Sequence, residues 1–185
     1  GFVCGAACVS LLMRAIHTMN IVLAALDRAW VPVYKDWRLN EKHYGSLQGR
    51  DKHEVELEAG AAQVQRWRRA YDCPAPALPP GDARLPELDA RYAGIPGEQL
   101  PVTESLRDTH ARVRSCWESR LRPLVYSTGA LLGVAHGNTL RALLMHLRGL
   151  SPAEVEQLEV PTAHPIRLVF DDDMRLIPPG AGVPG

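Results

Sequence analysis

Long apolar runs, charge imbalance and clustered cysteines are all missing from this sequence. No apolar stretch reaches the roughly 18 residues that a membrane-spanning helix needs. The 21 basic residues equal the 21 acidic ones, so we expect no general attraction to nucleic acid or to an anionic membrane. The four cysteines lack the density of a disulfide scaffold and the paired spacing of a zinc site. We therefore expect reduced thiols, no bound metal and a cytoplasmic protein.

What is present is an ordinary globular composition, with 46% hydrophobic and 23% charged residues. A chain of 185 residues is the size of one domain and can bury about 70% of its unfolded surface. Residues 1–185 are therefore interpreted as a single domain. The chain opens with Gly1, and no basic region precedes the small apolar stretch 1–8, so we predict no signal peptide. This opening is typical of the inside of a fold, and we expect the domain to be incomplete at its N-terminus.

The apolar pattern predicts helices that alternate with short strands. Helices are expected over 10–30, 54–71, 103–122, 139–149 and about 152–158. Strands are expected over 33–37 and 131–135, the second buried on both sides, and a hairpin over 166–177. Seven of the fifteen prolines lie in 74–101, which predicts an irregular surface excursion. The alternation indicates an α/β sandwich with a mainly parallel sheet and helices on both faces.

One segment combines a predicted buried strand with a turn that can bind an anion. The strand over 131–135 ends in His136-Gly137-Asn138 and leads into a helix, whose free N–H groups attract negative charge. His136 could exchange a proton with a bound phosphate or merely cap the next helix. Arg14, near the start of the first helix, could bind the same anion or extend into solvent.

The polar loop over 40–52 carries further candidates. Glu41 could act as a general acid/base, with Tyr44 and Lys52 as ligands, if this loop folds over an anion site. Arg68 and Arg69 could hold a carboxylate or a phosphate. Each of these residues could equally be a solvated surface group.

Five segments together resemble the cofactor-dependent phosphoglycerate mutases, and they occur in that family's order. They are SLLMRAIHT at 10–18, RLNEKHYGSLQG at 38–49, QRWRR at 65–69, VAHGNTLRA at 134–142 and EVPT at 159–162. The resemblance extends from about residue 9 to residue 177. It implies the three-layer α/β/α histidine phosphatase fold and the interconversion of 3- and 2-phosphoglycerate. It also implies a 2,3-bisphosphoglycerate primer, a phosphohistidine, no metal, and a homodimer or homotetramer.

The resemblance assigns roles to individual residues. Glu41 would be the general acid/base, and Arg14 and His136 would bind the transferring phosphoryl group. The residues that would hold the rest of the substrate or line the pocket edge are Tyr44, Lys52, Arg68, Arg69, Gly137 and Asn138.

The sequence departs from the family at one decisive point. The family's phosphate-accepting histidine lies in an Arg-His-Gly motif at the end of the first strand, and no such triplet occurs in these 185 residues. We therefore expect a fold without its first strand-helix unit, and a chain that is inactive by itself although its full-length parent is a mutase. Two alternatives are a non-catalytic phosphoglycerate-binding relic and a histidine-type phosphomonoesterase.

Overall fold

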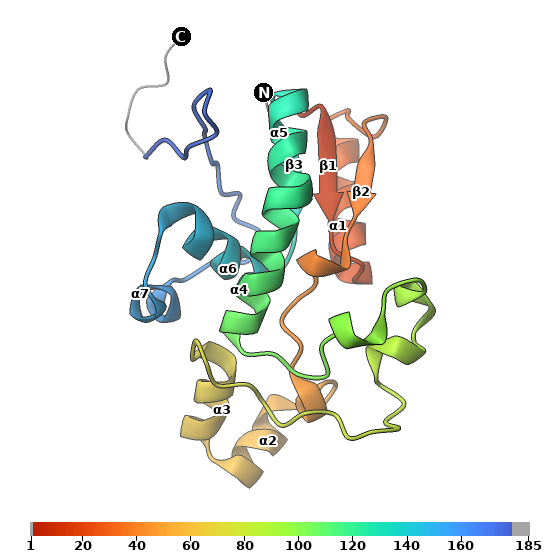
Figure 1. Cartoon of the computed structure of the whole chain (residues 1–185), viewed down its shortest axis with the longest axis vertical. Helices are drawn as coiled ribbons and strands as arrows, with labels where there is room; N and C mark the ends of the chain where they lie inside the picture. Colours follow the sequence, from red (N-terminus) through yellow and green to blue (C-terminus); the bar gives the residue numbers. More distant parts are fainter. Residues whose placement is uncertain (1, 179–185) are drawn as a thin grey trace.

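A short parallel sheet forms the centre of the molecule in the computed structural model, which describes residues 2–178 (Figure 1). Its strands are β1 (Ala6–Val9), β2 (Val33–Lys35) and β3 (Leu131–Val134), in the order β2-β1-β3. Cys8 of β1 lies opposite Tyr34 on one side and Gly133 on the other. Because the strands are parallel, their carboxyl ends share one edge, and the loops and helices that follow gather there (Figure 1).

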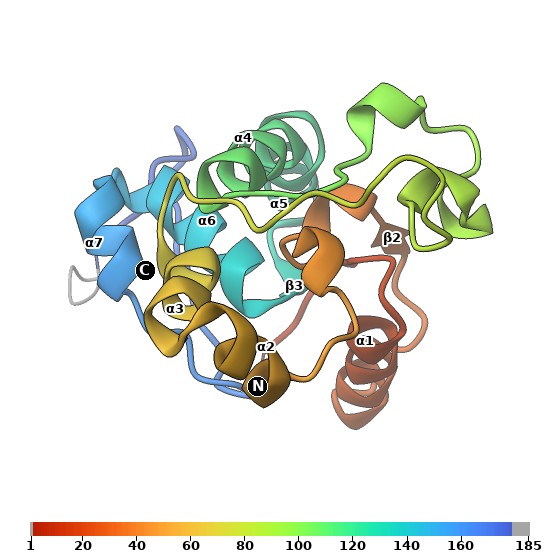
Figure 2. The same ribbon diagram turned by 90° about the horizontal axis from the view of Figure 1, so that it is seen from below.

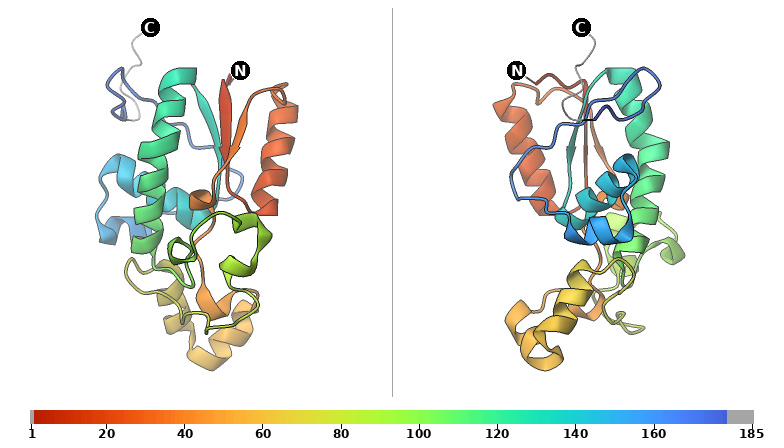
Figure 3. Two further views of the ribbon diagram at one scale, coloured as in Figure 1. Left: turned by 45° about the vertical axis from the view of Figure 1, so that its right-hand side comes forward. Right: turned by 90° about the vertical axis from the view of Figure 1, so that its left-hand side faces the viewer.

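Helices cover both faces of this sheet, as the predicted α/β sandwich requires (Figure 3). On one face, Ala7 and Val9 pack with Met19 and Leu23 of α1 (Met13–Ala25). On the other face, Cys8 packs in a core with residues of α4 (Leu106–Cys116), a π-helical turn (Trp117–Leu121), α5 (Arg122–Thr128) and α6 (Gly137–Arg148). The strand alternation thus divides the apolar side chains between two cores.

β3 differs from its prediction. It lies at the edge of the described sheet, and its residues are half-buried or exposed. The expectation that it is buried on both sides is therefore wrong for residues 2–178. An apolar run alone does not say how many neighbours a strand has.

Three predicted helices have different limits in the structure. The helical run predicted over 103–122 begins with α4 and continues to the end of α5. α1 ends at Ala25, well before Trp30, because Asp27 adopts a left-handed conformation with φ 54°. Trp30 is consequently 70% exposed, although it was expected on the buried stripe. The helix predicted over 54–71 is two helices, α2 (Lys52–Ala59) and α3 (Ala61–Arg69), which are separated by Gly60 at φ 84°.

Near the C-terminus the short helix is confirmed and the hairpin only in part. Ser151 and Glu154 form the expected capping box at the start of α7 (Pro152–Gln157). The predicted hairpin consists of an isolated antiparallel bridge between Phe170 and Leu176, without continuous strands. No helix within residues 2–178 has both the length and the apolar character needed to cross a membrane.

The excursion over 74–101 is irregular, as predicted, with three single 3₁₀ turns. It runs across the loop that holds Gly45 (Figure 2). Gly45 adopts φ 55°, and a Cβ added to it would lie 2.0 Å from the carbonyl oxygen of Pro76. Ser46 N donates to that same oxygen at 2.8 Å. Only glycine permits this close approach of the loop and the excursion.

Candidate active site

Three chain segments meet at the carboxyl edge of the sheet. Ser10 follows β1, the loop over 36–48 follows β2, and His136 follows β3 as the N-cap of α6. Thr139 of α6 donates to the carbonyl oxygen of Asn40 at 2.6 Å, which ties the loop to the helix. The predicted site residues of these segments are therefore close neighbours.

Glu41 lies against the N-terminus of α6. Its Oε1 accepts a hydrogen bond from Lys42 N at 2.8 Å and from Asn138 N at 3.3 Å. A Cβ on Gly137 would lie 4.0 Å from Oε2, so the glycine leaves open space beside the second oxygen. The partial positive charge at the helix start stabilises the carboxylate there.

His136 is a buried, neutral imidazole. Its Nε2 lies 2.7 Å from Ser10 Oγ, and only 8% of the residue is exposed. Burial, helped by the positive charge of Arg14, lowers the pKa of His136 to about 4. A neutral ring keeps both a proton donor and a proton acceptor at neutral pH, as proton transfer to and from a bound group requires.

Ser10 contacts His136 and was not among the predicted site residues, because the helix predicted over 10–30 makes it a helix cap. The N-cap of α1 is Leu12, and Ser10 Oγ instead accepts from Leu12 N at 3.2 Å while it contacts the imidazole. The available signal was the small apolar run before Ser10, which was not predicted as a strand and which forms β1 in the structure, since strand ends at this edge carry site residues.

Tyr44 lies against Asn138, among cationic groups. Its hydroxyl accepts from Asn138 Nδ2 at 2.9 Å. The guanidinium carbon of Arg68 and the Nζ of Lys42 lie 5.9 and 4.9 Å from the centroid of its ring. Lys42 is 1% exposed and donates to the carbonyl oxygen of Trp67, and burial lowers its pKa to about 8. Lys42 was not among the predicted site residues, because a lysine in a polar loop is usually solvated.

Two of the side chains predicted to bind the substrate form ion pairs with carboxylates of the protein. Lys52 forms an ion pair with Glu56 at 3.1 Å, one turn along α2. Arg69 forms one with Glu159 at 2.9 Å. A ligand that uses either cation has to compete with these exposed pairs, which are individually weak.

A buried ion pair fixes the loop that carries Glu41. Arg112 and Glu104 lie 2.6 Å apart and are 9% and 3% exposed. Arg112 also donates to the carbonyl oxygens of Arg38 and Glu41, and Glu104 accepts from His43 N. The pair therefore satisfies backbone groups of the loop and sets its path.

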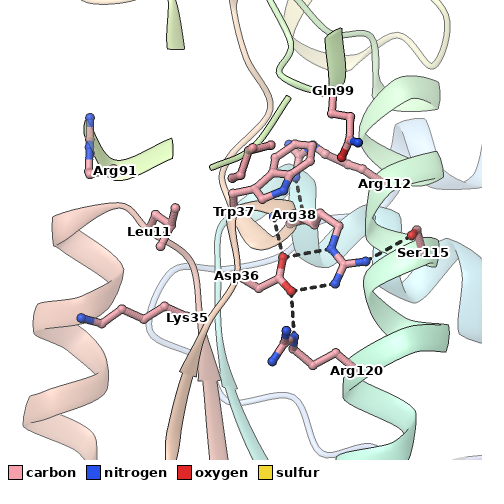
Figure 4. A pocket seen from close by; sticks show the side chains of 11 residues that line it. Leu11, Lys35, Asp36, Trp37, Arg38, Arg91, Gln99, Arg112, Ser115 and Arg120 are labelled. Carbon is pink, nitrogen blue, oxygen red and sulfur yellow. Dashed lines mark hydrogen bonds and ion pairs between the residues drawn. The ribbon is translucent and has the colours of Figure 1, made fainter. Parts of the chain in front are cut away.

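A hollow of about 660 Å³ lies between β2, α4 and the excursion, and none of the predicted site residues lines it (Figure 4). Asp36 accepts two bonds from the Arg38 guanidinium and forms an ion pair with Arg120 at 3.0 Å. Arg38 also donates to Ser115 and Ser119. Because the protein itself satisfies this guanidinium, we interpret the network as structural.

The depressed pKa of His136 predicts a pH-dependent stability. Between about pH 4 and 6.5 the unfolded chain binds more protons at this position, so the free energy of unfolding decreases as the pH falls through that window. The contribution lost is roughly 3 kcal/mol. Urea unfolding of the unsubstituted 185-residue chain (here the parent) and of His136→Gln at pH 7 and pH 4 should show a smaller loss of unfolding free energy in the variant. The exposed His17→Gln control should behave like the parent, and equal losses in all three proteins would contradict the assignment.

The comparisons with known proteins agree with this geometry. The model of the histidine phosphatase superfamily (branch 1) matches residues 2–95 and 82–177. The chain is 48% identical over 167 residues to the 2,3-bisphosphoglycerate-dependent phosphoglycerate mutase of Dichelobacter nodosus, which covers 90% of this chain and 68% of the relative. It is also 48% identical over 166 residues to the protein of the same name from Nitratidesulfovibrio vulgaris, with 90% and 67% covered.

Solved structures support the fold alone. A mycobacterial glucosyl-3-phosphoglycerate phosphatase is 23% identical with a TM-score of 0.57, and the match covers 83% of this chain and 63% of that one. Bacillus stearothermophilus YhfR is 19% identical with a TM-score of 0.58, and the match covers 94% and 71%. The chain thus spans less than two thirds of the mycobacterial protein's length and about two thirds of its curated relatives. By sequence and fold, it belongs to the histidine phosphatase superfamily and, within it, to the 2,3-bisphosphoglycerate-dependent phosphoglycerate mutases.

Proposed function

We propose that these residues bind phosphoglycerate, and that the whole protein to which they belong interconverts 3- and 2-phosphoglycerate. The observation that carries the proposal is the placement of the Glu41 carboxylate at the start of α6, the helix whose N-cap is the neutral His136. The 44–48% identity to proteins named as such mutases supports it.

Each group at this edge has a role that its chemistry allows. Arg14 and the N-terminus of α6 would offset the charge that spreads over a transferring phosphoryl group. His136 would hydrogen-bond that group through its neutral ring. Glu41, with one oxygen beside the open space at Gly137, would accept and return the proton of the substrate hydroxyl.

A second group of residues would recognise the rest of the substrate. Tyr44, Asn138 and Arg68 offer a phenol, an amide and a guanidinium within one cluster, which suits a small acid with a carboxylate and a phosphate. Arg69 would join them on release from Glu159, and Lys52 on release from Glu56.

The donor set also fits the bisphosphorylated primer that the relatives' name implies. Arginine guanidinium groups and a helix N-terminus are suitable partners for the phosphates of 2,3-bisphosphoglycerate. When bound, that molecule supplies a phosphoryl group for priming. The accepting histidine of an Arg-His-Gly triplet is not among the 185 residues, so we assign turnover to the whole protein.

Calorimetric titration of the 185-residue chain with 3-phosphoglycerate tests the proposal. We expect saturable binding of 3-phosphoglycerate, and binding at least about tenfold weaker for glycerate and for glycerol 3-phosphate, since each lacks one anionic group that the cluster would pair. Equal affinity for all three compounds, or no binding of any, would remove the proposal.

The oligomeric state and the cellular location of the protein remain predictions. We expect a homodimer or homotetramer in the cytoplasm. The phosphatases among the solved structures are below 25% identity, so they give no support to a hydrolytic function.

A further inference from the structure

We propose that Arg141 is a positioning residue that fixes the direction of proton donation at Tyr44, so that the phenol donates its proton to a bound phosphorylated acid. The inference rests on the proposed function and adds to it a residue of α6 that lies behind the cluster. Its basis is a chain of three side chains, Arg141, Asn138 and Tyr44, whose hydrogen bonds permit one direction.

The chain begins at a guanidinium that the fold holds in place. Arg141 is 3% exposed, and its Nε donates to the carbonyl oxygen of Val155 in α7 at 3.1 Å. Its Nη2 donates to the same oxygen. The remaining arm, Nη1, lies 2.9 Å from Oδ1 of Asn138. Arg141 therefore reaches Asn138 from a position that α7 has already fixed.

The guanidinium decides which way the Asn138 amide faces. Arginine has only donors, so the atom of Asn138 that faces it must be the carbonyl oxygen. The amide nitrogen then points to Tyr44 Oη, 2.9 Å away. Because the NH₂ group can only donate, the phenol oxygen accepts in this contact, and its own proton stays available.

The neighbours of the phenol make this direction matter. Glu41 contacts the backbone of Asn138, and the cations of Lys42 and Arg68 lie near the Tyr44 ring. An anion attracted by these cations needs hydrogen-bond donors. If the phenol donated its proton to Asn138, its oxygen would present only lone pairs to the anion. With Asn138 held by Arg141, Tyr44 meets the anion as a donor and requires no reorientation on binding.

A double-mutant cycle tests the inference on the 185-residue chain. Affinity for 3-phosphoglycerate is measured by calorimetry for four proteins: the unsubstituted chain, Arg141→Met, Tyr44→Phe and the double variant. We expect Arg141→Met to weaken binding about tenfold when Tyr44 is present, the scale of one hydrogen bond to a charged group, and to have no effect in the Tyr44→Phe background. Equal weakening in both backgrounds would show a structural role and overturn the inference.

Two further variants distinguish the hydrogen-bond geometry of Arg141 from its positive charge. Arg141→Lys keeps the charge but loses the planar fork that engages the carbonyl and the amide together, so we expect weaker binding here too. Full parental affinity of Arg141→Lys would reveal a charge effect instead and overturn the inference. This variant also carries the test if Arg141→Met does not fold. Arg148→Met, at the exposed end of the same helix, is the matched control and should bind like the parent.

A measurement without ligand distinguishes failure of the inference from failure of the proposed function. Donation from Asn138 lowers the pKa of the Tyr44 phenol against the larger, opposing effect of burial. When Arg141 is replaced by lysine, which keeps the positive charge that itself lowers this pKa, the amide is free to turn, and the Tyr44 pKa should rise in a ¹³C-tyrosine NMR titration. An unchanged titration overturns the inference, whereas a rise in a chain that binds no 3-phosphoglycerate overturns the proposed function alone.

Discussion

The 185-residue chain is expected to turn over phosphoglycerate about 10⁶-fold more slowly than a chimera that adds, before residue 1, a segment of a mutase relative that contains an Arg-His-Gly triplet. The factor is the typical cost of removing a nucleophile. In this family the nucleophile is expected in an Arg-His-Gly triplet, which these 185 residues do not contain. Conversion of 3-phosphoglycerate in a coupled assay, primed with 2,3-bisphosphoglycerate, measures both rates.

The matched control is the same chimera with the histidine of its added triplet replaced by alanine. It should be as inactive as the 185-residue chain while its melting temperature stays that of the active chimera. Substantial turnover by the 185-residue chain itself would mean that it does not use the family's covalent route.

Glu41→Gln in the active chimera is expected to lower kcat by about 10² to 10⁴-fold, the usual contribution of a general acid/base. Glutamine can still accept from Lys42 N and Asn138 N, so the loop should keep its position. Affinity for 3-phosphoglycerate and the melting temperature should therefore change little. The rate is measured in the coupled assay and the affinity by calorimetry.

Glu58→Gln is the control for this substitution. Glu58 of α2 is 60% exposed and pairs with Arg50, away from the start of α6, so its loss should leave kcat unchanged. Near-normal turnover of Glu41→Gln would remove Glu41 from the mechanism.

The parts of the fold that could be predicted are those with local signals. The capping box at Ser151 marks a helix start by side chains three residues apart, and the prolines of 74–101 exclude regular elements there. Helix ends were less predictable. Gly60 and Asp27 end helices through backbone conformations with positive φ, which the apolar periodicity around them does not reveal.

The site divides in the same way. Glu41, His136 and Asn138 lie in segments whose resemblance to a known family assigned them to the site, and the structure brings these three residues together. Lys42 and Arg141 are residue types that usually lie in solvent, yet both are almost fully buried. Their partners are carbonyl oxygens of Trp67 and Val155, and only the folded chain brings those oxygens within reach.

The contact between Gly45 and Pro76 makes the proline-rich excursion an outer wall of the site. Tyr44 directly precedes this glycine, so an insertion or deletion in 74–101 would reach the phenol through the backbone. Variation in the length of that stretch is therefore a route by which relatives could accept larger or smaller phosphorylated acids while every residue of the cluster stays the same.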